Sequence, residues 1–167
     1  MDTWGEFALR EPDLAARGRQ LLYQFGVGLA FLATVRPDGG PRVHPMCPLL
    51  TDTSMFGFIV PSPKQRDLRR DGQYAIHSFP CPENEDAFYV VGRAGLVEDH
   101  ALRSSLADQF VVERAQFSVP PPAATDLLFE FLIERCMATT TTGHGDRNPT
   151  TWCGVRWAPE GAAADDV

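Results

Sequence analysis

Residues 29–50 of the chain have the sequence LAFLATVRPDGGPRVHPMCPLL. The run from Leu29 to Arg36 is rich in apolar and β-branched residues, which favour a strand. Pro37-Asp38-Gly39-Gly40 predicts a turn, because proline presets φ and glycine accepts a positive φ. A second apolar run follows from Arg42 to Leu50. This stretch therefore predicts an antiparallel β-hairpin.

Further segments of strand-favouring composition follow along the chain, at Met55 to Val60, Tyr74 to Phe79, Ala87 to Val97, Leu127 to Thr141 and Thr151 to Trp157. Gly143 to Pro149 is expected to form the turn between the last two. A doubly wound parallel sheet requires strands that alternate regularly with helices, and this order lacks that alternation. The sequence predicts a mainly β (α+β) fold, an antiparallel barrel of six to seven strands with peripheral helices.

Helices are predicted at Pro12 to Phe25, at Ser62 to Asp71 and after Asp99. In the first of these, proline suits the first helical position and Gly26 supplies the stop. In the last, apolar side chains recur every four residues, at Leu102, Leu106 and Phe110. Pro120-Pro121-Pro122 predicts an extended linker before the next strand.

The charge balance limits the class of partner. The chain has 15 Lys and Arg against 22 Asp and Glu, a net charge of −7. Proteins whose main partner is a nucleic acid or an anionic membrane normally carry a basic excess, so we expect neither partner. A local basic cluster can still bind a small anion, and the residues between 64 and 70 supply one: Lys64, Arg66, Arg69 and Arg70.

The length of 167 residues predicts one domain, residues 1–160, followed by a mobile acidic tail, residues 161–167. The N-terminal residues lack the charge and apolar run of a secretory signal, and no apolar run reaches the ~20 residues that span a bilayer, so a cytoplasmic protein is expected. The cysteines, Cys47, Cys81, Cys136 and Cys153, form no C-x-x-C pair. We therefore expect reduced thiols and no metal site.

The start of the helix at Ser62 is the strongest indication of a ligand. Ser62 is the predicted N-cap, Pro63 the first helical residue, and Gln65 the third residue of a capping box. Cations in a first helical turn oppose the helix dipole by ~0.3–1 kcal/mol, yet Lys64 and Arg66 lie there. A bound phosphate reverses that sign, because helix N-termini bind anions.

The order of these features resembles the pyridoxamine 5′-phosphate oxidase-like superfamily of FMN-binding split barrels. The matching residues are the strand and turn at 30–39, Gly40-Pro41-Arg42-Val43-His44-Pro45, Phe56-Gly57-Phe58-Ile59-Val60, Ser62-Pro63-Lys64 with Asp67-Leu68-Arg69, a strand ending in a small-residue turn at Val90-Val91-Gly92-Arg93-Ala94, and Arg156-Trp157-Ala158-Pro159. The resemblance implies a split barrel that forms a homodimer, with FMN in the groove between the subunits.

Carried over residue by residue, the resemblance implies that the flavin phosphate contacts Arg42, Ser62, Lys64 and Arg66. Residues similar to those that line the isoalloxazine ring are Val43, His44, Pro45, Ile59 and Val60, and Ser78 matches a position near the cofactor. The implied activity is an FMN-dependent oxidoreductase that acts on a small molecule by hydride transfer at flavin N5. His44 and His77 are candidate proton donors, and no other catalytic residue is indicated.

Pyridoxamine phosphate oxidases proper continue into a substrate-binding segment with Trp, Arg and His, whereas this chain turns into Glu160-Gly161-Ala162-Ala163. We therefore expect a reaction other than vitamin B6 oxidation. Two alternatives stay open: reduction with the deazaflavin F420 in the same groove, and a non-catalytic flavin or haem carrier. Haem would need an axial ligand such as His44 or His77.

Overall fold

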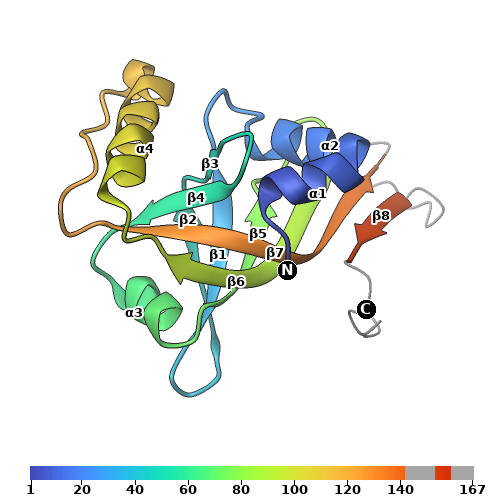
Figure 1. Cartoon of the computed structure of the whole chain (residues 1–167). Helices are drawn as coiled ribbons and strands as arrows, with labels where there is room; N and C mark the ends of the chain where they lie inside the picture. Colours follow the sequence, from blue (N-terminus) through green and yellow to red (C-terminus); the bar gives the residue numbers. More distant parts are fainter. Residues whose placement is uncertain (142–152, 159–167) are drawn as a thin grey trace.

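The computed structural model describes residues 1–141 and 153–158, and of residues 153–156 the backbone only. Its elements are, in chain order, α1 (Trp4–Arg10), α2 (Pro12–Leu22), β1 (Ala30–Val35), β2 (Pro41–Met46), β3 (Leu49–Leu50), β4 (Met55–Ile59), α3 (Pro63–Arg70), β5 (Gln73–Ser78), β6 (Ala87–Leu96), α4 (His100–Glu113), a 3-10 turn (Ala115–Phe117), β7 (Leu127–Thr140) and β8 (Cys153–Trp157). The strands form one antiparallel eight-stranded sheet, with helices around it (Figure 1). The predicted α+β split barrel is confirmed.

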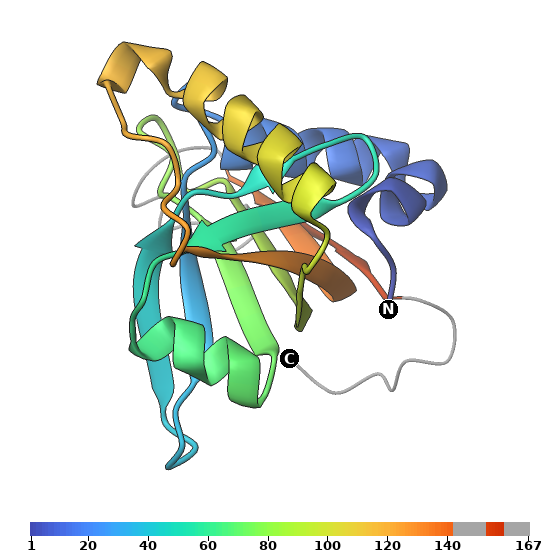
Figure 2. The ribbon, with the colours of Figure 1, turned by 60° about the vertical axis from the view of Figure 1, so that its left-hand side comes forward.

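The sheet curls so that its two ends meet. Its strand order is β2-β1-β5-β6-β7-β4-β3, with β8 paired to β7. Met46 of β2 nevertheless packs on Gly57 of β4, where an added Cβ would lie 2.7 Å from Met46 Cε. Figure 2 shows the β1–β2 hairpin extending beside α3, the helix that follows β4. The split of the barrel therefore lies between β2 and β4, and α3 begins beside it.

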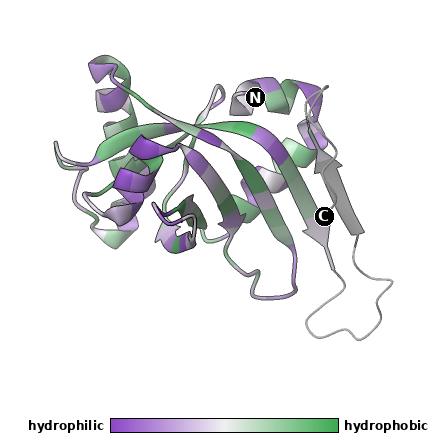
Figure 3. Ribbon diagram, turned by 90° about the horizontal axis from the view of Figure 1, so that it is seen from below, coloured by the Kyte–Doolittle hydropathy of each residue, from purple (hydrophilic) through white to green (hydrophobic). Residues whose placement is uncertain are grey.

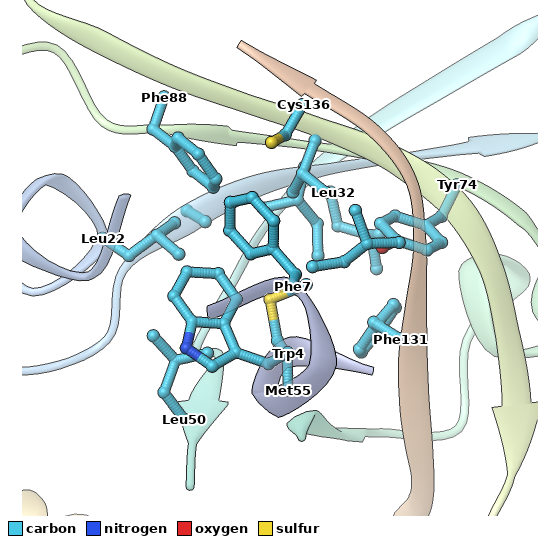
Figure 4. Close-up of a cluster of buried hydrophobic side chains, with 14 of the residues drawn as sticks. Trp4, Phe7, Leu22, Leu32, Leu50, Met55, Tyr74, Phe88, Phe131 and Cys136 are labelled. Atoms are coloured by element: carbon cyan, nitrogen blue, oxygen red, sulfur yellow. The ribbon is translucent and has the colours of Figure 1, made fainter. Parts of the chain in front are cut away.

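Apolar side chains fill the inside of the curl. Trp4 and Phe7 project from α1 into this core, where the Trp4 ring packs edge to face against the rings of Phe7 and Phe88 (Figure 4). A second, smaller cluster lies under α4 and joins it to β3, β4 and β7, with Leu49, Phe56, Leu106 and Leu128 as its buried members. The predicted repeat on the helix after Asp99 thus supplies a packed residue, Leu106.

The structure differs from the sequence prediction at three elements. Helix α2 ends at Leu22 and not at Phe25. Helix α1 was not predicted, although Thr3 and Glu6 form a complete capping box at its start. The predicted strand Arg42 to Leu50 is two strands, because the chain crosses the split at Cys47-Pro48: the Tyr23 hydroxyl donates to Pro48 O and accepts from Leu50 N–H there.

The predicted small-residue turn at residues 90–94 is also wrong, because these residues lie inside β6. The ladder between β6 and β7 shifts register between Val91 and Gly92, which marks a β-bulge. An added Cβ on Gly92 would lie 1.9 Å from Leu132 O. The small residue is needed for the close approach of two strands rather than for a turn.

We expect Gly92→Ala to destabilise the protein by roughly 2–3 kcal/mol, because the new methyl group meets backbone that cannot move without breaking the ladder. Gly95→Ala on the same strand is the control, since nothing lies within 4 Å of its added Cβ. Chemical denaturation of both variants measures the difference. Equal free energies of unfolding would contradict the assigned packing of the bulge.

The outer face of the sheet carries an apolar surface. Cross-strand register places Pro45, Phe31, His77, Tyr89 and Met137 in one row across β2, β1, β5, β6 and β7. The next row contains Val43, Ala33, Ala75, Val91 and Arg135. None of these side chains is buried, and the two rows contain no carboxylate. Hydrophobic and hydrophilic stretches alternate along the strands in Figure 3, as expected for a sheet with one face in the core. We call these two rows the outer face.

Candidate functional site

The predicted phosphate-contacting residues come together at the split of the barrel. Arg42 lies on β2, and Ser62, Lys64 and Arg66 lie at the start of α3. Two contacts join these elements: Lys64 Nζ donates to Pro45 O at 3.2 Å, and Arg42 Nε donates to Asp67 Oδ2 at 2.8 Å. Segments about 20 residues apart in the sequence therefore form one basic site.

The N-terminus of α3 offers a single free backbone donor. The Ser62 hydroxyl accepts from Gln65 N–H at 3.4 Å, and Ser62 O accepts from Arg66 N–H at 3.3 Å. Pro63 has no N–H, so Lys64 N–H is the donor of the first turn that makes no hydrogen bond within the described part of the chain. The predicted cap is present, but the capping box is not: Gln65 Nε2 donates to Ile59 O and Thr125 O instead.

Lys64 is partly withdrawn from solvent at the N-terminus of α3, which we call the tip of α3. Burial lowers the pKa of its ammonium group, and the nearby Cys47 acts in the opposite direction. One of its three donors is used by Pro45 O, which leaves two. An anion at the tip would oppose the lowering of this pKa by favouring the charged form.

Arg42 uses one edge of its guanidinium inside the protein. Its Nε donates to Asp67, whose side chain is only 3% exposed, and its two Nη groups donate to no other described residue. The Arg42 side chain itself is 26% exposed. The geometry leaves the Nη edge available to a ligand, and guanidinium groups bind phosphate oxygens in pairs.

Asp67 is the centre of this arrangement, and the sequence indicated no role for it. Thr34 Oγ1 of β1 donates to Oδ2 at 3.0 Å, and Arg70 Nη1 of α3 donates to Oδ1 at 3.1 Å. Burial alone would raise the pKa of Asp67, but the hydrogen bonds from Arg42, Arg70 and Thr34 hold it below its usual value. The folded chain shows why the carboxylate is needed: Thr34 lies on the buried side of β1 opposite Arg42, and a buried hydroxyl needs a hydrogen-bond partner.

Of the residues predicted to line a flavin ring, most are exposed beside the tip. Val43 is 59% exposed and Val60 51%, and His44 and Pro45 are exposed as well. Ile59 differs, because its side chain is buried and its carbonyl accepts from Gln65 Nε2. Arg36 N–H donates to Gly40 O, so by the alternation of an antiparallel ladder the Val43 N–H faces away from β1 at the free side of β2.

The remaining candidates lie apart from one another. His44 pairs with Leu32 on the inward-facing side of the ladder, whereas His77 belongs to the outer face. His77 Nδ1 lies 2.6 Å from Ser78 O, a carbonyl that can only accept, and Nε2 makes no hydrogen bond in the described part of the chain. Ser78 is fully buried, and its hydroxyl accepts from Phe88 N–H, so it is engaged within the sheet.

The donors at the split fit a phosphate group. They are the Nη edge of Arg42 and the N–H and Nζ groups of Lys64. Arg66 follows on the same helix, where its side chain is exposed and has no ion-pair partner in the described ranges. The Ser62 hydroxyl donates its proton to Val60 O, so this proton is already used within the protein. Within residues 1–141 and 157–158, no three His, Cys, Asp or Glu side chains gather as they would around a metal ion.

A hollow of about 370 Å³ lies beside the bulge and shares Val91 and Arg135 with the outer face. Its lining residues are Gln73, Tyr74, Val91, Gly92, Arg93, Glu134 and Arg135. It contains none of the predicted site residues. None of the helices in the described chain has the length and apolar composition to cross a membrane.

No protein-family model and no curated protein sequence matches the chain. Solved structures match its fold. A pyridoxamine 5′-phosphate oxidase-like protein from Listeria innocua superposes with a TM-score of 0.55 at 16% identity, over 71% of this chain and 91% of that one. An F420 reductase gives a TM-score of 0.55 at 18% identity, over 70% of this chain and 94% of that one.

A haem-binding protein from Mycobacterium smegmatis gives a TM-score of 0.60 at 15% identity, over 86% of this chain but only 57% of its own length. These structures share one fold and carry names that refer to different ligands. At such identities the likeness concerns the fold, which is that of the pyridoxamine 5′-phosphate oxidase-like split barrels. The choice of ligand depends on the residues of this chain.

Proposed function

We propose, from this split-barrel fold and the basic site between β2 and α3, that the protein binds FMN and acts as a flavin-dependent oxidoreductase on a small molecule. One observation carries the proposal. On a chain with a net charge of −7, the Lys64 ammonium and the free Lys64 N–H lie where α3 begins, and Arg42 of β2 reaches the same helix at Asp67 with its Nη edge free of described partners. A phosphate dianion is the ligand whose charge and oxygen atoms suit that set of donors.

The ring of the flavin is assigned to the exposed surface next to the tip. Val43 and Val60 offer apolar contact, and the outward Val43 N–H offers a hydrogen bond to a ring carbonyl. When bound, the flavin supplies hydride transfer at N5. The chain binds and orients the cofactor, and His44, exposed on the same strand between Val43 and Pro45 in sequence, is a candidate proton donor.

F420 is the second candidate ligand, since Arg66 and Arg69 are exposed and without an ion-pair partner in the described ranges, and its longer anionic tail would need such residues. Haem is the third. His77 is exposed and has Phe31 and Tyr89 as its cross-strand neighbours, which gives an imidazole in apolar surroundings.

A homodimer belongs to the same proposal, with the outer face as its contact surface. The two rows of this face are mostly apolar and contain no carboxylate, although the whole chain is acidic and Glu134, next to Arg135, lines the adjoining hollow. Two copies of a chain with a net charge of −7 repel each other least where neither presents acidic groups. Pro45 and Val43 belong both to this face and to the proposed ring site, so the partner subunit would lie next to the cofactor.

The visible spectrum of the purified protein tests the proposal, followed by titration of the ligand-free protein with FMN, riboflavin, F420 and haemin. We expect the two bands of FMN and a preference for FMN over riboflavin, because only FMN carries the phosphate. A single band at shorter wavelength would indicate F420, and an intense Soret band would indicate haem. A colourless protein that takes up no FMN would overturn the proposal.

A further inference from the structure

The buried carboxylate of Asp67 connects three elements around the basic site. It accepts hydrogen bonds from Thr34 of β1, from Arg42 of β2 and from Arg70 of α3. Arg70 also donates through its Nη2 to Val35 O at the end of β1. The β1–β2 hairpin is therefore attached to α3 through one side chain, close to the split of the barrel.

The contact with Asp67 occupies only one of the three nitrogen atoms of the Arg42 guanidinium. Asp67 takes the Nε of Arg42, and the Nη groups stay free of described partners. Asp67 is 3% exposed, whereas Arg42 is 26% exposed, so the guanidinium runs from the protein interior to the surface. A long side chain held at one edge keeps its other edge in a fixed place, which removes the ordering cost that a free arginine would have on binding.

We propose that Asp67 is the positioning residue that fixes Arg42 for recognition of the cofactor phosphate, an inference that rests on the FMN-binding function proposed above. Asp67 does not contact the ligand. It acts through Arg42, and it sets how strongly the protein prefers the phosphorylated flavin, FMN, to riboflavin.

Two effects of Asp67 oppose each other, and variants can separate them. Its carboxylate orders Arg42, which favours phosphate, but its negative charge repels phosphate. Asp67→Glu keeps the charge and displaces the carboxylate, whereas Asp67→Asn keeps the shape and removes the charge. Positioning predicts that both variants lose preference for FMN. A role limited to charge predicts that Asp67→Asn gains preference and that Asp67→Glu is unchanged.

Asp86→Asn is the matched control. Asp86 is also buried and also accepts from an arginine, Arg17, and from Thr141 N–H. It precedes β6 and contacts none of the residues at the split. Its loss should affect stability in a similar way to the loss of Asp67, without a specific effect on the phosphate site.

The experiment measures dissociation constants of FMN and of riboflavin for the unaltered 167-residue chain and the three variants, with thermal unfolding as the check on folding. The preference for FMN is the dissociation constant of riboflavin divided by that of FMN. We expect this ratio to fall about tenfold in Asp67→Asn and Asp67→Glu and to stay unchanged in Asp86→Asn. A ratio that is unchanged or raised in either Asp67 variant would overturn the positioning role. Equal affinity of the unaltered protein for both flavins would instead refute the proposed phosphate site itself.

Discussion

Lys64→Glu is expected to weaken FMN binding by at least about a hundredfold, ~2.8 kcal/mol, while the fold is kept. The substitution replaces an ammonium group at the tip of α3 with a carboxylate, so attraction to the phosphate becomes repulsion. Opposite charges about 4 Å apart near a protein surface interact by up to about 4 kcal/mol before solvent screening, which makes this estimate conservative. Fluorescence titration of the ligand-free variant with FMN measures the effect.

Arg69→Glu is the control for Lys64→Glu. It makes the same change of charge on the same helix, but Arg69 is exposed and makes no hydrogen bond or ion pair with β2 among the described residues. Its effect on FMN affinity should be several-fold at most, as for a screened surface charge. If the two variants lose FMN affinity by the same factor, Lys64 acts only through the overall electrostatic field of the helix and not through contact with the phosphate.

Ala75→Glu should shift the dimer–monomer equilibrium toward monomer by at least about a hundredfold, because a two-fold interface brings like charges together at several kcal/mol. Ala75 lies near the centre of the outer face, between Ala33 and Val91. Sedimentation velocity across a range of protein concentrations measures the shift.

Ala101→Glu is the control for Ala75→Glu, since Ala101 is an exposed alanine in the first turn of α4, away from the outer face. It should leave the association state unchanged. A dimer that survives Ala75→Glu would place the contact surface elsewhere, and a monomeric unaltered protein would remove the homodimer from the proposal.

The parts of the fold that local chemistry determines could be predicted from the sequence. Alternating apolar residues and a Pro-Asp-Gly turn define the first hairpin, and Ser62-Pro63 defines the start of α3. The break at Cys47-Pro48 could not be predicted, because it depends on the Tyr23 hydroxyl from a distant helix and on the curl of the sheet. Helix α1 has only seven residues, and its stability comes from burying Trp4 and Phe7.

In the candidate site, too, the residues set by local sequence could be predicted, and those that depend on distant segments could not. The basic residues of the tip are visible in the sequence as a cluster that helix stability does not explain. Asp67 remained hidden because its role depends on three elements that meet only in the folded chain. The same folding uses the Ser62 hydroxyl as a cap and the Ser78 hydroxyl within the sheet, so a residue type that suits a ligand does not by itself show that the group is free.

A crystal structure of the protein grown with excess FMN tests the central claim most directly. The account predicts the phosphate at the start of α3, with its oxygens on Arg42 Nη and on Lys64, and Asp67 still bonded to Arg42 Nε. Density for the flavin at any other place, with the tip of α3 bare, would contradict it.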